Sequence, residues 1–219
     1  TPVSIADRDA EQAMRQLISE TYPDHGIFGE EHGIKGLEKE YIWVLDPIDG
    51  TVAYLAGKPQ FGTLIALVHR GSPIIGIIDQ PVLGERWLGA MGHNTTFNGL
   101  EAATRTCSQL EKANLNTTSP DMFKGKNSVD FSKLAERAAA TMYGGDCYAY
   151  VLLASGYIDL IVEADLKPYD FCALMPIING AGGSITDWQG HLLNLNSDGR
   201  VIASGDPAIL AQAIEVLKE

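Results

Sequence analysis

The chain has 219 residues, of which 45% are hydrophobic and 20% charged, and its formal net charge at pH 7 is −12. This length and composition can bury a substantial core, and no apolar run approaches the roughly 20 residues that a membrane-spanning helix needs. The acidic balance argues against nucleic-acid phosphate as a partner. It permits a small phosphate ester, because a bound cation reverses the local field. We therefore expect a small-molecule partner, with no nucleic acid and no membrane.

The cysteines and the N-terminus bear on the compartment. Cys107, Cys147 and Cys172 are odd in number and have no paired spacing, which predicts reduced thiols and neither a disulfide frame nor a zinc site. The first residues lack a basic segment followed by an apolar stretch, so they do not resemble a secretory signal. We expect a cytoplasmic protein, or one of the plastid stroma if a transit peptide has been removed.

The first predicted element is a helix within residues 1–22, ending before Pro23. Five apolar residues share one of its faces at helical spacing: Ala10, Ala13, Met14, Leu17 and Ile18. Asp7 lies at the start of this helix. Such a residue is either a plain N-cap or a functional side chain, and the helix pattern alone leaves both interpretations open.

An apolar strand ends at two carboxylates, Asp46 and Asp49. The proline between them fixes a turn and Gly50 opens it, so both side chains can converge on one hard cation. The main-chain carbonyl of Ile48 offers a third oxygen, and Thr51 adds a hydroxyl and, if a helix begins there, N–H groups for an anion. Such a set suits magnesium with a phosphate.

Ordinary turn chemistry would also explain this run of residues if it stood alone. Further acids end other segments, at Gly29-Glu30-Glu31 upstream and at Asp170 downstream, which favours a site. The alternating acids of a calcium loop are absent. The glycine-rich segment 180–183 follows a helical pattern and lacks the full dinucleotide-binding fingerprint.

From residue 61 the pattern changes to strands. Residues 61–69, 73–78 and 86–90 predict an antiparallel meander, residues 94–99 a turn, and the polar stretch 119–130 a mobile loop between two halves.

The second half alternates helices and strands, which favours a layered α and β structure. Asp146 is expected to cap one of these helices. The predicted elements are a helix over 131–140, a helix over 146–156, a strand over 158–163, a helix over 170–178, strands over 184–187 and 200–203, and a helix over 207–217.

The acidic motifs together resemble the inositol monophosphatase family of magnesium-dependent phosphatases, over essentially the whole chain. The resemblance implies an α+β sandwich layered in the order α-β-α-β-α. We expect residues 1–118 to form a metal-binding half and residues 119–219 a half that completes the substrate pocket, together one compact unit. The family has a further helix and some sheet before the segment around Asp7, so we expect that N-terminal part to be missing here. A homodimer is also implied.

The resemblance further implies roles for individual residues. Thr51 and Asp7 would orient and help deprotonate the attacking water, and Glu31 would hold another water beside the metals. Two or three Mg²⁺ ions would be held by Glu30, Asp46, the Ile48 carbonyl, Asp49 and Asp170. The substrate would be bound by Gly50, Thr51, Gly144, Gly145, Asp146 and Glu163.

The residues around 143–150 and 166–170 resemble the histidinol-phosphate phosphatase branch more than the inositol branch. Asp146 and Glu163 can hold the ammonium and imidazole groups of histidinol, which predicts a histidinol-phosphate phosphatase of histidine biosynthesis. If Asp146 is only a cap and Glu163 only a strand-end acid, an inositol-1-phosphate or sugar-phosphate phosphatase remains open. An inactive metal-binding scaffold is the alternative of another class, disfavoured because every expected ligand and the Thr51 hydroxyl are present.

Overall fold

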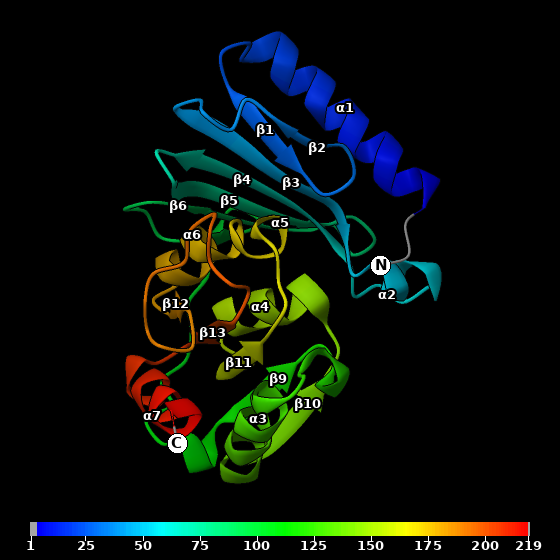
Figure 1. Cartoon of the computed structure of the whole chain (residues 1–219). Coiled ribbons are helices and arrows are strands. Elements are labelled where there is room, and N and C mark those ends of the chain that lie inside the picture. Colours follow the sequence, from blue (N-terminus) through cyan, green and yellow to red (C-terminus); the bar gives the residue numbers. More distant parts are fainter. Residues whose placement is uncertain (1–3, 219) are drawn as a thin grey trace.

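Two β-sheets lie between three layers of helices in the computed structural model, which describes residues 4–218 (Figure 1). The helices are α1 (Ile5–Thr21), α2 (Thr51–Leu55), α3 (Lys126–Arg137), α4 (Asp146–Ala154), α5 (Pro168–Phe171), α6 (Leu174–Gly180) and α7 (Pro207–Lys218). Helix α1 covers the outer face of the first sheet, α4, α5 and α6 lie between the sheets, and α3 and α7 cover the second sheet. The predicted α-β-α-β-α order and α+β class are confirmed.

The first sheet holds eight strands. They are β1 (Gly26–Gly29), β2 (Gly33–Lys35), β3 (Tyr41–Asp49), β4 (Gly62–His69), β5 (Ser72–Gln80), β6 (Glu85–Ala90), β7 (Thr96–Phe97) and β8 (Leu100–Glu101). Their order is β2-β1-β3-β4-β5-β6-β7-β8, with β1 parallel to β3 and the other pairs antiparallel. The meander predicted for β4 to β6 is confirmed.

The second sheet holds five strands in the order β10-β9-β11-β13-β12, with β9 parallel to both β10 and β11. They are β9 (Asn114–Thr117), β10 (Ala140–Tyr143), β11 (Leu160–Glu163), β12 (Ser184–Thr186) and β13 (Val201–Ser204), and two short 3-10 helices are η1 (Leu110–Lys112) and η2 (Pro120–Met122). Since β9 precedes residue 119, the second sheet begins within the range predicted for the first half. The division into 1–118 and 119–219 stays a prediction.

Helix α1 forms where it was predicted, but its inward face is only partly apolar: Ile18 and Met14 pack against β1 and β3, and two polar residues complete the face. Asp7, Glu11 and Ile18 are buried, whereas Ala13 is exposed and Leu17 is 67% exposed. The two polar residues point inward because donors lie beneath them: the N–H groups of the turn after β1 donate to Glu11, and the Ser4 N–H and the Thr51 hydroxyl donate to Asp7.

Two further expectations need correction. Residues 94–99 are not only a turn, since β7 pairs with β8 around Asn98 and Gly99, both with left-handed backbone angles (φ 47° and 83°). The stretch 119–130 is not a continuous loop, because η2 and the first turn of α3 lie within it. Helix α3 therefore begins and ends earlier than predicted, and β10 occupies the residues that follow it.

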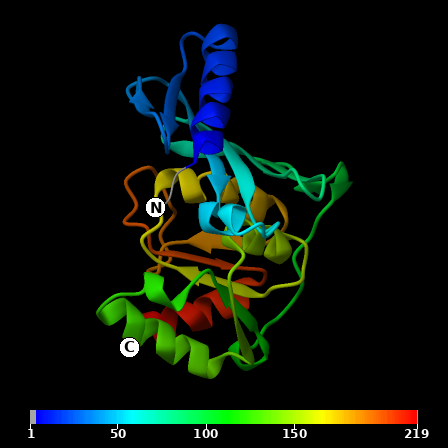
Figure 2. The ribbon, with the colours of Figure 1, turned by 90° about the vertical axis from the view of Figure 1, so that its right-hand side faces the viewer.

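The layer between the sheets packs closely on the first sheet. Gly76 on β5 and Gly89 on β6 face α6 and the residues just before it, and a Cβ atom at either position would overlap main-chain atoms of Ala173 or of Pro176 and Ile177. Figure 2 shows the resulting stack, with α1 at one end of the molecule and α3 and α7 at the other. No helix among residues 4–218 is long and apolar enough to cross a bilayer.

We expect Gly89→Ala to lower the free energy of unfolding by about 1–3 kcal/mol, the usual range for overpacking, because α6 must move away from β6. Thermal unfolding followed by circular dichroism measures this. Leu88→Ala, on the exposed face of the same strand, is the control and should change the transition less. A Gly89→Ala protein that melts with the wild type would contradict the close packing.

Candidate metal centre and active site

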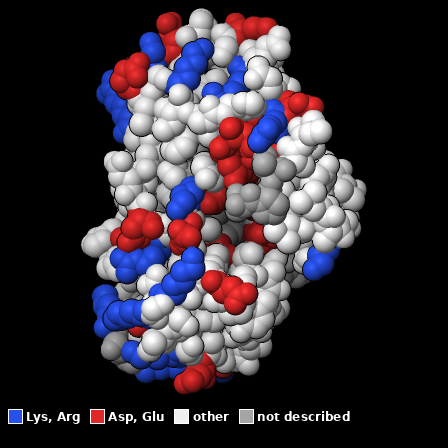
Figure 3. Space-filling model, turned by 45° about the vertical axis from the view of Figure 1, so that its right-hand side comes forward, with Lys and Arg blue, Asp and Glu red and all other residues white. Residues whose placement is uncertain are grey.

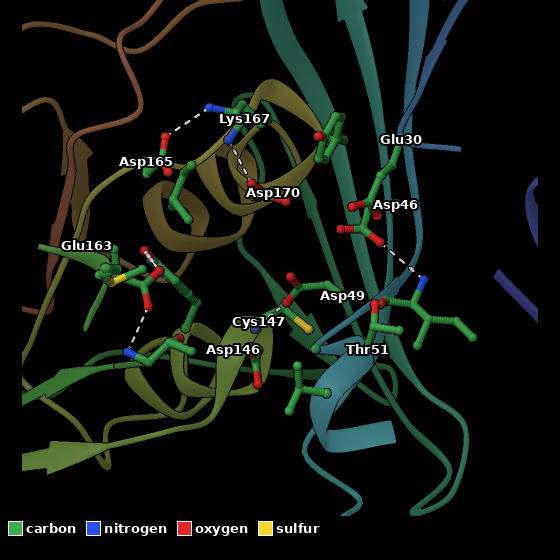
Figure 4. A pocket seen from close by; sticks show the side chains of 18 of the residues that line it. Glu30, Asp46, Asp49, Thr51, Asp146, Cys147, Glu163, Asp165, Lys167 and Asp170 are labelled. Carbon is green, nitrogen blue, oxygen red and sulfur yellow. Dashed lines mark hydrogen bonds and ion pairs between the residues drawn. The ribbon is translucent and has the colours of Figure 1, made fainter. Parts of the chain in front are cut away.

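A cavity of about 400 Å³ opens where β3 ends, beside α5 and the start of α4 (Figure 4). Seven carboxylic acids line it, and Lys167 is the one Lys or Arg in its lining among the described residues. The acids are Glu30, Asp46, Asp49, Asp146, Glu163, Asp165 and Asp170. Figure 3 shows acidic side chains in and around a hollow of the molecule, which fits this lining.

Asp46, Asp49 and Asp170 form the centre of the cavity, each with a carboxylate oxygen within 4.8 Å of the others. The pairing of β3 with β4 shifts register between Asp46 and Asp49, so both side chains reach the same point although they lie three residues apart. Asp170 comes from α5, where it accepts a hydrogen bond from the Lys167 N–H at 2.6 Å. The sequence placed these acids at segment ends, and the fold brings those ends together.

The protein itself supplies little positive charge to this cluster. Burial and the neighbouring carboxylates hold the pKa of Asp46 and of Asp49 well above their ordinary values. Burial also raises the pKa of Asp170 to about 7. Close carboxylates with raised pKa values and no basic partner among them favour the binding of a cation. Their all-oxygen donor set fits a hard divalent ion.

Backbone hydrogen bonds orient the cluster. The Cys147 N–H, at the start of α4, donates to Asp49 Oδ2 at 2.5 Å, and the Ile48 N–H donates to Asp46 Oδ1 at 3.1 Å. The Ile48 carbonyl, predicted as a further oxygen ligand, accepts the Thr51 hydroxyl at 3.1 Å, and Ile48 is one of the residues that line the cavity.

Glu30 is held beside the cluster by a residue that the sequence analysis missed. Glu11 is fully buried on α1 and accepts hydrogen bonds from the N–H groups of Glu31 at 2.7 Å and His32 at 3.1 Å. Arg15 pairs with Glu11 at 2.6 Å. These bonds fix the turn that carries Glu30. The spacing of Asp7, Glu11 and Arg15 by four residues, which places them on one helix face, is a signal that would have found them.

Thr51 and Asp7 meet across 44 residues of sequence. Thr51 Oγ1 lies 3.4 Å from Asp7 Oδ1. The other Asp7 oxygen accepts the Ser4 N–H at 2.8 Å, so Ser4 is the N-cap and Asp7 is the third helical residue of a capping box. Asp7 is therefore not the N-cap: one of its carboxylate oxygens completes the capping box, and the other lies near the Thr51 hydroxyl.

A second pair of acids also lines the cavity: Asp146 lies beside Gly50 and near Asp49, and Glu163 lies farther from the metal cluster (Figure 4). Asp146 does not cap α4, since Gly145 occupies the N-cap position. Burial raises the pKa of Asp146 to about 6, opposed by the charge of Lys58. Glu163 is the last residue of β11 and is 2% exposed.

Four predicted residues do not line the cavity themselves. Asp7 reaches it through Thr51. Glu31 faces Arg8, with 3.8 Å between Oε2 and Nε, and Gly144 and Gly145 form the turn before α4 with left-handed angles of 91° and 112°. Gly50, in contrast, lies in the cavity wall with φ 85°, and a Cβ there would approach Asp146 Oδ2 to 3.0 Å.

The sequence profile of the inositol monophosphatase family matches residues 1–219. The chain belongs to the inositol monophosphatase family. This is a family of metal-dependent phosphatases, so the chain is a phosphoric monoester hydrolase by class, and the cluster of Asp46, Asp49 and Asp170 is its candidate metal centre.

Relatives within the family carry different names. The chain is 49% identical over 227 residues to the "Bifunctional phosphatase IMPL2, chloroplastic" of Arabidopsis thaliana. This match covers 100% of this chain and 66% of the relative. It is 33% identical over 205 residues to a histidinol-phosphatase of Chlorobaculum parvum, covering 93% of this chain and 79% of the relative. A solved inositol monophosphatase from Zymomonas mobilis is 46% identical, with a TM-score of 0.93 over 100% of this chain and 89% of that one.

The raised carboxyl pKa values predict how stability depends on pH. A group whose pKa is higher folded than unfolded stabilises the fold below its unfolded pKa and loses this contribution as pH rises through its folded pKa. For Asp170, the unfolded pKa is 3.8 and the folded pKa is about 7. The metal-free protein should therefore lose stability between about pH 4 and about pH 7 from this source, and Mg²⁺ should raise the melting temperature more at about pH 8 than at about pH 5.

Melting curves with EDTA and with Mg²⁺ at both pH values measure this effect. Asp49→Asn serves as the matched variant, because it removes one charge from the cluster. It should raise the melting temperature of the metal-free protein, shrink the Mg²⁺ effect and abolish hydrolysis. An equal Mg²⁺ effect at both pH values would contradict the interpretation of the cluster.

Proposed function

We propose that the chain is a magnesium-dependent histidinol-phosphate phosphatase. The observation that carries the substrate choice is the second carboxylate pair, Asp146 and Glu163, which shares the cavity with the metal cluster. A phosphate ester bound at the cluster would place its alcohol part against this pair. Two acids there favour an alcohol with cationic or hydrogen-donating groups, and histidinol carries both an ammonium and an imidazole.

The rest of the lining supports a cationic substrate. Lys167 lies 3.1 Å from Asp165, so this lysine already has a partner at the mouth of the cavity and does not neutralise the inner pair. With its pKa of about 6, Asp146 is largely ionised at neutral pH. An uncharged cyclitol would bring no positive charge to these acids beyond the effect of Lys58 on Asp146, whereas a cationic group would offset the cost of burying them.

The names of two relatives also support the proposal. The Chlorobaculum parvum protein is named a histidinol-phosphatase. The Arabidopsis thaliana protein is named a bifunctional phosphatase, which is compatible with histidinol phosphate as one of two substrates. Histidine biosynthesis would be the pathway served. The word chloroplastic in the name of that relative is compatible with the plastid stroma as the compartment.

Magnesium is the proposed cofactor, held by Glu30, Asp46, Asp49, Asp170 and the Ile48 carbonyl. When bound, it would supply positive charge to the phosphoryl oxygens and to the leaving oxygen. The N–H groups of Gly50 and Thr51 are assigned to orienting the phosphate.

We assign the removal of a proton from the attacking water to Thr51 and Asp7. The Thr51 hydroxyl has one proton and two acceptors, the Ile48 carbonyl and Asp7. When it donates to Asp7, its lone pairs are free to accept a proton from water, and Asp7 takes the proton that Thr51 releases. Glu31 is assigned to a second water at the edge of the site.

An inositol-1-phosphate or sugar-phosphate phosphatase is the second candidate. Its support is the 46% identity to the inositol monophosphatase of Zymomonas mobilis. An inactive metal-binding scaffold is less well supported, because Thr51, Asp7 and the acids converge as a hydrolytic site needs. The homodimer implied by the family resemblance stays a prediction.

Phosphate release from a panel of esters in Mg²⁺ tests the proposal. Histidinol phosphate should have a higher kcat/KM than inositol 1-phosphate and 2-glycerophosphate. Asp146→Asn or Glu163→Gln should reduce this preference by roughly 10- to 100-fold, the size of a lost charge-assisted hydrogen bond. Equal losses on charged and uncharged esters would favour the inositol or sugar-phosphate alternative. No release from any ester would favour the scaffold.

Thr51→Val keeps the shape of the side chain and removes its hydroxyl. We expect kcat to fall by about 10²-fold or more, as for lost general-base assistance, with the Mg²⁺ dependence unchanged. Steady-state kinetics over a Mg²⁺ titration separates the two quantities. A variant whose loss is recovered by more Mg²⁺ would assign Thr51 to metal binding and Asp7 to capping alone.

A further inference from the structure

Glu163 is held by one hydrogen bond on each carboxylate oxygen. The Thr118 N–H, just after β9, donates to Oε1 at 2.9 Å, and the Tyr150 hydroxyl donates to Oε2 at 2.8 Å. A carboxylate offers about four acceptor positions. Two donors from different elements therefore fix its plane and leave two positions for a ligand in the cavity that Glu163 lines.

Tyr150 is placed for this contact by its helix. It lies on α4, three residues after Cys147, and both residues line the cavity. The two therefore share one face of the helix. The Cys147 N–H donates to Asp49, and the Tyr150 hydroxyl donates to Glu163. One rigid element thus contacts an acid of the metal cluster and an acid of the second pair.

The hydroxyl of Tyr150 acts as a donor only. The side chain is 1% exposed, and burial together with the charge of Glu163 holds its pKa well above the ordinary value. Burial raises the pKa of Glu163, while the hydrogen bonds from Thr118 and Tyr150 oppose that rise. The hydroxyl thus favours the ionised form of the acid, which is the form that binds a cation.

We propose that Tyr150 is a positioning residue for substrate selectivity, whose hydroxyl holds the Glu163 carboxylate in the orientation that receives the cationic part of the alcohol. This inference rests on the proposed histidinol-phosphate activity. Tyr150 contacts Glu163 and not the phosphate site, so its hydroxyl is expected to matter for one class of ester and not for hydrolysis itself.

Tyr150→Phe is the test, and α4 provides a matched control. Tyr148, two residues earlier, also donates its hydroxyl to a glutamate at 2.8 Å, but that partner is Glu85 on β6, outside the cavity lining. Tyr150→Phe should raise KM for histidinol phosphate by about tenfold with kcat little changed, the effect of one hydrogen bond to a charged group. Its kcat/KM for 2-glycerophosphate should stay near wild type. Tyr148→Phe should leave kcat/KM unchanged for both substrates.

A double-mutant cycle with Glu163→Gln shows whether Tyr150 acts through Glu163. In the Glu163→Gln background, Tyr150→Phe should cause no further loss of selectivity. Equal losses on both esters, or a selective loss that persists in that background, would overturn the positioning role. Melting curves in Mg²⁺ establish that each variant is folded.

The wild-type ratio of kcat/KM for histidinol phosphate to kcat/KM for 2-glycerophosphate distinguishes the two proposals. A wild-type enzyme that does not prefer histidinol phosphate refutes the proposed function and this inference with it. A wild-type enzyme with the preference, combined with a Tyr150→Phe variant that retains it, refutes the inference alone.

Discussion

Carboxylates that share a partly buried site repel one another, and this repulsion governs the structure around the cavity. Asp46, Asp49 and Asp170 lie within 4.8 Å of one another, and burial raises the pKa of each. Two of them end a strand of the first sheet, and the third begins a helix between the sheets. A cation that neutralises them also joins these segments, so metal binding and the stability of the layered arrangement are coupled.

The surrounding elements hold the acids in place without neutralising them. Backbone N–H groups from α4 and from the residue before α5 bond to Asp49 and Asp170, and Glu11 on α1 fixes the turn of Glu30. Such bonds set the direction of each side chain but bring no net charge. The geometry of the acids is therefore fixed by the protein while their negative charge is retained, which favours the binding of a cation.

Under the proposed function, the acids of the cavity have two different roles. The metal cluster and Thr51 would act on the phosphate, which every phosphate ester presents. Asp146 and Glu163 would contact the alcohol, which differs between esters. Relatives with different names share this fold, as expected when the chemistry is common and selectivity lies in a few side chains opposite it.

The sequence by itself determined the strand that ends at Asp46 and Asp49, the layered α and β class, and most helices, because these depend on periodicity and on local turn chemistry. It placed α3 too late, and it did not predict that Asp7 and Glu11 are buried on α1 beside Ile18. Only the tertiary structure decided that Glu11 faces the Glu30 turn and that Tyr150 meets Glu163. Those contacts depend on hydrogen-bond donors and acceptors from segments far apart in the chain, and no local pattern records which distant group a buried polar side chain will find.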